Sequence, residues 1–144
     1  MKISVINGPN LNMLGIREPE HYGKTTYKEL VEIIEEHAKK VGCEVSVFQS
    51  NHEGELVDKI QEAYFKGYDG IVINPAAYTH TSIAILDAVK STSLPTVEVH
   101  ISDLSIREQF RQKSYIRDAA IKTITGHGVL GYTEAIDFLI KEKK

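Results

Sequence analysis

The sequence predicts an α/β fold in which parallel strands alternate with helices. Apolar runs rich in β-branched residues recur along the 144 residues, and each is followed by a loop and a segment of helical periodicity. This alternation is typical of βαβ units. The runs expected to form strands are 3–6, 45–48, 70–73, 96–99 and 119–124.

The helices are expected from capping residues and apolar stripes. Residues 26–29 have the form of a capping box, and they open a stripe that ends before Gly42. The members of that stripe are Leu30, Val31, Ile34, Ala38 and Val41. Further helices are expected over 54–66, 81–91 and, in a short form, 106–113. The last helix carries an i, i+3, i+4, i+7, i+8 stripe made of Tyr132, Ala135, Ile136, Leu139 and Ile140.

Right-handed crossovers join such units into a flavodoxin-like three-layer sandwich, whose five-stranded parallel sheet has the order 2-1-3-4-5. Residues 1–144 are expected to form a single catalytic domain, because the length suits one domain and no repeat divides it. The loop at about residues 8–25 is far longer than the roughly 2–6 residues of an ordinary βα loop. We therefore expect it to act as a lid.

Composition excludes several classes of function. The net charge is −3 and no Lys/Arg-rich run is long enough to follow a phosphate backbone, so no nucleic-acid partner is expected. The longest apolar stretches have strand length, and the first leads directly into a polar loop, so we expect no membrane association and a cytoplasmic location. The single cysteine, Cys43, excludes an internal disulfide, and its place at the start of a strand indicates a buried apolar role.

Polar side chains concentrate at the carboxyl ends of the expected strands, which is where ligands bind in open parallel sheets. We expect these residues to converge on one cleft suited to a small polyhydroxylated ligand. In strand order they are Asn7 and Asn10; Ser50 and Asn51; Asn74, Tyr78, Thr79 and His80; Glu98, His100 and Ser102; and Gly126, His127 and Gly128. Arg107 and Arg111, one helical turn apart in the expected short helix, are candidates to clamp a carboxylate.

Most of these residues also have a purely structural interpretation. For Asn7, Asn51 and Asn74 the alternative is a strand-end turn or cap, and for His80 it is a hydrogen bond to a backbone carbonyl. For Arg107 and Arg111 the alternative is a solvated charged face, and for His127 it is turn geometry. His21, His37 and His52 are expected at the surface. The histidines lack HxxxH spacing, so no metal site is expected.

Two pairs carry the acid–base chemistry. Arg17 and Tyr22 stand on either side of Pro19, and a guanidinium near a phenol favours the phenolate, which makes Tyr22 a candidate base. Glu98 and His100 lie two apart on a strand and face the same way, so the carboxylate can orient the imidazole for proton transfer. An exposed cross-strand pair is the alternative for Glu98 and His100.

Several motifs in order closely resemble those of the type II 3-dehydroquinate dehydratases. They are NGPNLN at 7–12, REP at 17–19, YG at 22–23, NPAAYTHTS at 74–82, VEVHIS at 97–102 and REQFR at 107–111. The resemblance runs essentially end to end. It implies reversible, cofactor-free dehydration of 3-dehydroquinate to 3-dehydroshikimate through an enolate in the shikimate pathway. It also implies a homododecamer built as a tetramer of trimers.

The resemblance further implies roles for matched residues. Tyr22 resembles the family's base, Arg17 the residue that keeps the base ionised, His100 the acid, and Asn10 the asparagine that holds a water on the enolate oxygen. The matched substrate-binding positions are Asn74, His80, Ile101, Ser102, Arg111 and, supplied across a trimer interface, Asp87. The chain departs from the family pattern at Asp103 and over 114–123.

A flavin- or phosphate-binding module with the same fold is the alternative class of function. Gly8 is followed by Pro9, which lacks the backbone donor that a phosphate cradle uses. Neither a GxGxxG pattern nor a Walker loop occurs in the chain. The sequence therefore favours the enzyme.

Overall fold

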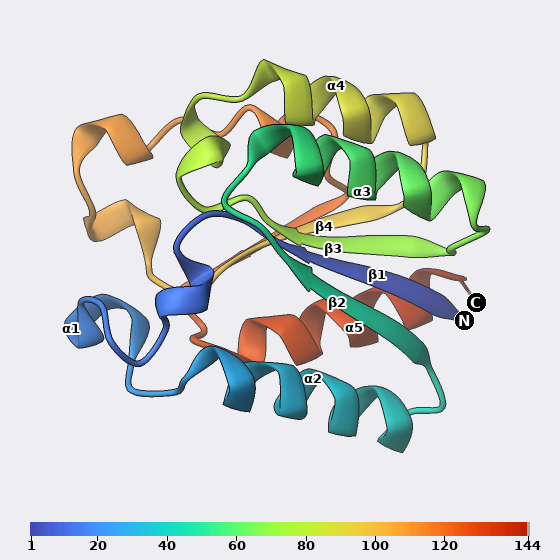
Figure 1. Ribbon diagram of the computed structural model, residues 1–144, viewed down its shortest axis with the longest axis horizontal. Coiled ribbons are helices and arrows are strands. Elements are labelled where there is room, and N and C mark those ends of the chain that lie inside the picture. Colours follow the sequence, from blue (N-terminus) through green and yellow to red (C-terminus); the bar gives the residue numbers. More distant parts are fainter. Residues whose placement is uncertain (144) are drawn as a thin grey trace.

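A computed structural model describes residues 1–143, and they form a five-stranded parallel sheet in the order β2-β1-β3-β4-β5. The strands are β1 (Lys2–Asn7), β2 (Glu44–Gln49), β3 (Gly70–Asn74), β4 (Thr96–His100) and β5 (Lys122–Thr125). Two helices cover each face: α2 (Tyr27–Lys40) and α5 (Leu130–Lys143) on one, α3 (Glu53–Phe65) and α4 (Ile83–Thr92) on the other (Figure 1). The predicted flavodoxin-like sandwich is confirmed.

An apolar core lies on each face of the sheet because side chains alternate along the strands. In β1, Ile3 and Val5 belong to the core under α2 and α5, whereas Ile6 belongs to the core under α3 and α4. Four members of the predicted stripe of α5 are buried as expected, namely Tyr132, Ala135, Ile136 and Leu139, whereas Ile140 is only partly buried. Both faces are therefore closed, and this leaves the ends of the strands for function.

The start of α2 follows the predicted capping box. The Thr26 hydroxyl accepts a hydrogen bond from the Glu29 backbone at 3.1 Å, and the Glu29 carboxylate accepts one from the Thr26 backbone at 3.3 Å. The buried positions of the helix are Leu30, Ile34 and Ala38. Cys43, which lies between Gly42 and the start of β2, is buried as expected.

The expected helix over 106–113 is wrong. This segment instead forms two short 3₁₀ helices, η3 (Leu104–Ile106) and η4 (Gln109–Arg111), with Arg107 in an extended conformation between them. Asp103 caps η3 by accepting the Ser105 backbone N–H at 3.0 Å. Arg107 and Arg111 therefore do not lie one helical turn apart.

The predicted start of the last strand, at residue 119, is three residues too early. Ile116 is fully buried, and it anchors a 3₁₀ helix, η5 (Ile116–Asp118), whose carbonyls accept the backbone N–H groups of Ala119 and Ala120. The strand β5 consequently begins at Lys122. The apolar run at 119–121 mimicked a strand because periodicity alone does not separate short apolar turns from strands.

The long segment after β1 contains a 3₁₀ helix, η1 (Leu11–Met13), and a short helix, α1 (Pro19–Tyr22). Leu11 and Leu14 are buried in the core beneath α2, so the first part of the segment is anchored. Gly8 donates a backbone hydrogen bond to the Asn74 carbonyl at 2.8 Å, and a Cβ there would lie 2.4 Å from the Pro75 oxygen. Only glycine allows this close approach between the loops that follow β1 and β3. Action as a lid stays a prediction.

Within residues 1–143, no helix combines the length and the apolar character that crossing a membrane requires.

Candidate active site

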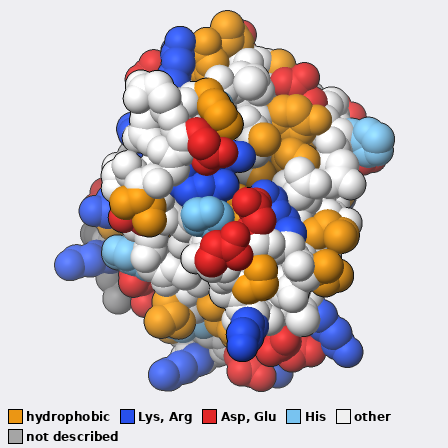
Figure 2. Space-filling view, turned by 90° about the vertical axis from the view of Figure 1, so that its left-hand side faces the viewer, with side chains coloured by type: hydrophobic (Ala, Val, Ile, Leu, Met, Phe, Trp, Pro, Cys, Tyr) orange, Lys and Arg blue, Asp and Glu red, His pale blue; other side chains and the backbone are white. Residues whose placement is uncertain are grey.

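A pocket of about 110 Å³ lies at the carboxyl ends of β1, β3 and β4. Figure 2 shows this end of the molecule, where basic, acidic and histidine side chains gather near the centre of the face. The functional groups that line the pocket come from the segments following these strands. They are Asn10, Arg17 and Tyr22; Asn74 and His80; and His100, Ile101, Ser102, Arg107 and Arg111.

The Tyr22 phenol lies between two guanidinium groups. Arg17 Nη2 and Arg107 Nη1 each donate to the Tyr22 oxygen at 3.1 Å, and Arg107 Nη1 also reaches the Ser102 hydroxyl at 3.2 Å. The Arg17 and Arg107 Cζ atoms lie 4.3 and 5.4 Å from the centre of the phenol ring. Two cationic groups therefore contact the Tyr22 oxygen and lie close to the phenol ring.

Arg107 is held in the charged form. Burial opposes the charge, but the hydrogen bond to Tyr22 and the neighbouring Tyr22 and Glu108 groups outweigh burial and raise the pKa of Arg107. The predicted proximity of Arg17 and Tyr22 is confirmed by the structure, whereas the contact of Arg107 was missed. Arg107 lies 85 residues from Tyr22, so no local spacing pattern links them.

His100 and Glu98 form a buried hydrogen-bonded pair, with His100 4% exposed and Glu98 inaccessible. Burial alone would raise the pKa of the Glu98 carboxyl, but the bond to His100, the Ser114 hydroxyl and the Arg117 charge outweigh burial and lower it. The carboxylate contacts His100 Nε2, so this nitrogen carries the hydrogen and Nδ1 remains for a ligand. The exposed alternative for this pair is excluded.

His80 lines the pocket and also bonds to the backbone. Its Nδ1 lies 2.6 Å from the Lys113 carbonyl oxygen, which can only accept, so Nδ1 carries the hydrogen and Nε2 offers a lone pair. Burial lowers the pKa of His80 in spite of that hydrogen bond, which favours the neutral ring. His80 can therefore accept a hydrogen bond from a ligand hydroxyl.

A buried tyrosine positions Asn74 at the floor of the pocket. Asn74 Nδ2 donates to the Tyr132 hydroxyl at 2.9 Å, Tyr132 in turn donates to Asn7 Oδ1 at 2.6 Å, and Asn74 Oδ1 accepts the Ala76 backbone N–H at 3.1 Å. Burial raises the pKa of Tyr132 well above its ordinary value. Asn7 thus supports the site from behind and does not line it.

Asn10 lies at the mouth of the pocket with a left-handed backbone at φ 69°. Its backbone N–H donates to Asn51 Oδ1 at 3.0 Å, and Gln49 Nε2 donates to the same oxygen at 3.2 Å. Asn51 therefore has a structural role, although neither as a turn former nor as a helix cap, because its side chain fixes the loop that carries Asn10.

The expectation that all strand-end polar residues meet in one cleft is wrong. Those outside the pocket lining are Asn7, Ser50, Asn51, Tyr78, Thr79, Glu98, Gly126, His127 and Gly128. His127 pairs with Glu134 at 2.7 Å on the surface, in a turn where both flanking glycines have positive φ. Asp87 lies exposed on α4 and is likewise outside the lining of this pocket.

One group of potential metal ligands occurs in the part of the chain that the structure describes. Glu18, Glu20 and His21 offer ligand atoms that lie within 4.8 Å of one another beside the pocket. Glu18 already pairs with Arg17 at 3.1 Å, and both carboxylates are exposed. The group therefore belongs to the surface of the segment that carries Tyr22.

Comparison with known proteins agrees with this geometry. The family model described as Dehydroquinase class II matches residues 1–140. A 3-dehydroquinate dehydratase of Clostridium perfringens (strain SM101 / Type A) is 54% identical over 144 residues, covering 100% of this chain and 99% of that protein. A catabolic 3-dehydroquinase of Debaryomyces hansenii is 52% identical over 141 residues, covering 98% of each. The crystal structure of a type II dehydroquinase from Butyrivibrio crossotus DSM 2876 superimposes with a TM-score of 0.96 at 55% identity, covering 97% of both chains. The chain therefore belongs to the class II dehydroquinase family.

Proposed function

We propose that the pocket at the carboxyl ends of β1, β3 and β4 removes water from 3-dehydroquinate to give 3-dehydroshikimate. The chain is a hydro-lyase of the type II family. One observation carries the assignment of the site to this reaction: the phenol of Tyr22, flanked by two guanidinium groups, shares a pocket with His100, whose ring is held from behind the lining by Glu98. A base and an acid are thus available on either side of a small ligand.

In the first step the Tyr22 phenolate takes a proton from the carbon next to the substrate ketone. Arg17 and Arg107 stabilise the phenolate before the transfer, and both remain cationic as the negative charge moves onto the substrate. The electron pair of the broken C–H bond goes to the carbonyl oxygen and gives an enolate. In this proposal Asn10 holds a water on that oxygen.

In the second step the enolate re-forms the ketone and expels the hydroxyl group as water. Protonated His100 supplies the proton through Nδ1, because its Nε2 is occupied by Glu98. The substrate's remaining polar groups are bound by the other lining residues, Asn74, His80, Arg111, Ser102 and the backbone of Ile101. The neutral His80 accepts from a substrate hydroxyl, and Arg111 binds the carboxylate.

We extend the proposal to a cytoplasmic homododecamer in which Asp87 approaches the pocket of a neighbouring subunit. Asp87 is exposed on α4, and Ile83, one turn earlier on the same helix, is 54% exposed. An exposed isoleucine beside the acid supports burial of this face by a second subunit. A 16.1 kDa species that keeps full activity at low concentration would contradict the extension.

The experiment is to add 3-dehydroquinate and follow the ultraviolet absorption of the conjugated enone product. His100→Gln should abolish most turnover, and His127→Gln provides a matched control because His127 also pairs with a carboxylate but lies outside the pocket. Absence of enone formation by the wild-type protein, or equal activities of the two variants, would overturn the proposed function or the assignment of His100 respectively.

A further inference from the structure

The buried Glu98 carboxylate is held by groups that lie outside its own strand. Ser114 Oγ donates to Glu98 Oε2 at 2.9 Å, and Thr123 Oγ1 of β5 approaches Oε1 at 3.4 Å. Oε2 is the same oxygen that contacts His100. A change in the charge density on this carboxylate therefore changes the strength of its interaction with the imidazole of His100.

Arg117 brings a surface charge to this buried group. Its Nε lies 3.9 Å from Glu98 Oε1, and its side chain is 48% exposed while Glu98 is inaccessible. The Arg117 backbone N–H also donates to Ser114 Oγ at 3.2 Å, which directs the hydroxyl hydrogen of Ser114 toward Glu98. Fully buried Ile116 fixes η5, and with it both contacts, to the core.

We propose that Ser114 and Arg117 are positioning residues that act through Glu98 and set the pH at which His100 carries its acid proton. The inference rests on the proposed function only in that His100 is the acid of the reaction. Neither residue lines the pocket, so neither touches the substrate.

The sign of the coupling follows from the charges around the pair. Arg117 partly neutralises Glu98, and this weakens the attraction that stabilises the imidazolium of His100. Loss of Arg117 should therefore let His100 hold its proton to higher pH. The groups that face Glu98 and His100 from the surrounding elements are His80 from η2 (Ala76–His80), Ser114 and Arg117 at η5, and Thr123 from β5. Arg111 from η4 lines the same pocket as His100 and acts on His80.

The test is a titration of the His100 ring by NMR in the free enzyme, so it does not depend on turnover. In Arg117→Gln the midpoint should rise by about 0.5 pH unit, as expected for one half-exposed ion pair. Arg117→Lys should restore most of the wild-type midpoint. Lys39→Gln removes the same charge from an exposed position on α2, and its midpoint should equal that of the wild type.

The salt dependence of the midpoint shift distinguishes the Arg117–Glu98 contact from the Ser114–Glu98 contact. The shift in Arg117→Gln should shrink at about 1 M salt, where screening acts over roughly 3 Å. Ser114→Ala also raises the midpoint because Glu98 loses a direct donor, and this shift should persist in salt. In a Glu98→Gln background, Arg117→Gln should cause no further change.

Activity measurements complete the test. The falling limb of the kcat/KM–pH profile, which reports the free enzyme, should move to higher pH in Arg117→Gln together with the NMR midpoint, with KM nearly unchanged at the pH optimum. An unmoved His100 midpoint at low salt would overturn the inference, and reduced turnover with an unmoved midpoint would do so too, because it would show a merely structural role. A moved midpoint in a protein that does not form the enone would support the coupling and overturn the proposed function.

Discussion

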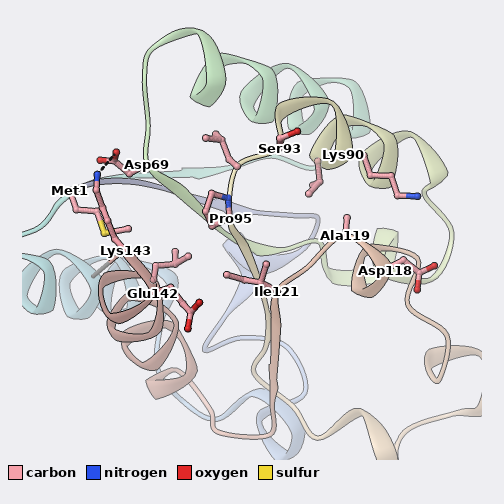
Figure 3. A pocket seen from close by; sticks show the side chains of 13 residues that line it. Met1, Asp69, Lys90, Ser93, Pro95, Asp118, Ala119, Ile121, Glu142 and Lys143 are labelled. Carbon is pink, nitrogen blue, oxygen red and sulfur yellow. Dashed lines mark hydrogen bonds and ion pairs between the residues drawn. The ribbon is translucent and has the colours of Figure 1, made fainter.

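Two hollows lie at opposite ends of the sheet, and the smaller one is the proposed catalytic site. The hollow at the amino ends of the strands measures about 620 Å³, against about 110 Å³ for the pocket at the carboxyl ends. In the larger hollow, Asp69 is already bonded to Lys143 at 2.6 Å, and Pro95 and Ile121 supply apolar surface (Figure 3). The smaller pocket combines three arginines, two histidines and a phenol. Convergent polar groups, more than volume, identify a catalytic site.

The difference arises from the connections at the two ends. At the amino ends, short turns lead from helix to strand, and Gly42, Gly67 and Ser93 adopt positive φ to make them. At the carboxyl ends, long segments follow β1 and β4 and carry most of the lining residues. Short turns bring few side chains together, whereas long segments can fold over a strand end and aim several at one point.

The largest effect should come from Tyr22. In Tyr22→Phe, turnover should fall by at least about 10²-fold because the base is lost, while the binding of a substrate analogue changes by only a few fold. Steady-state kinetics and calorimetry measure the two quantities. Near-normal turnover would refute the role of Tyr22 and remove the main distinction between the two hollows.

The arginines around Tyr22 should have the next largest effect. Arg17→Ala and Arg107→Ala should each lower kcat roughly 10²-fold, and the rising limb of the pH–rate profile should move to higher pH because the phenolate loses a cation. Arg17→Lys should keep more of the rate. An unchanged pH profile in both alanine variants would show that the arginines serve only substrate binding.

Loss of the Tyr132 hydroxyl, which lies behind the pocket, should lower the stability of the fold. Tyr132→Phe leaves Asn7 Oδ1 and Asn74 Nδ2 without their hydrogen-bond partner and should lower the free energy of unfolding by about 1–3 kcal/mol in urea titrations. The exposed Tyr64→Phe is the control. An equal loss in both variants would contradict the buried network.

The same tyrosine has a pH signature. The folded-state pKa of Tyr132 is raised by burial, so the unfolded chain releases this proton first and wild-type stability should decline above about pH 10. Tyr132→Phe removes this contribution, so its stability should decline less steeply over the same range.

The smallest effect should come from the lysines. The described lining of the catalytic pocket contains no lysine, whereas Lys90 and Lys143 line the amino-end hollow. Borohydride added with substrate should therefore leave activity and protein mass unchanged, and Lys90→Gln should keep turnover within about 2-fold. A stable adduct on Lys24 or Lys113, the lysines closest in sequence to pocket segments, would favour an imine route over the enolate route.

The site was only partly predictable from the sequence. Pairs close in sequence were found, because Arg17 and Tyr22 share one loop and Glu98 and His100 share one strand face. For Arg107 the sequence predicts a carboxylate clamp on a short helix, whereas this segment forms two 3₁₀ helices and Arg107 contacts Tyr22. The roles of the site residues stay predictions.

The sequence by itself determined the fold and the family. Periodicity, capping residues and glycines act locally, and they predicted the five strands, the four main helices and the sheet order, although not the segment 104–111 or the start of β5. Only the tertiary structure decided which polar residues line the pocket and which support it. Asn7 and Asn74 have the same position in neighbouring strands, yet Tyr132 of the distant helix α5 places one behind the pocket and the other in it. Contacts between distant segments depend on packing in three dimensions, which local spacing does not encode.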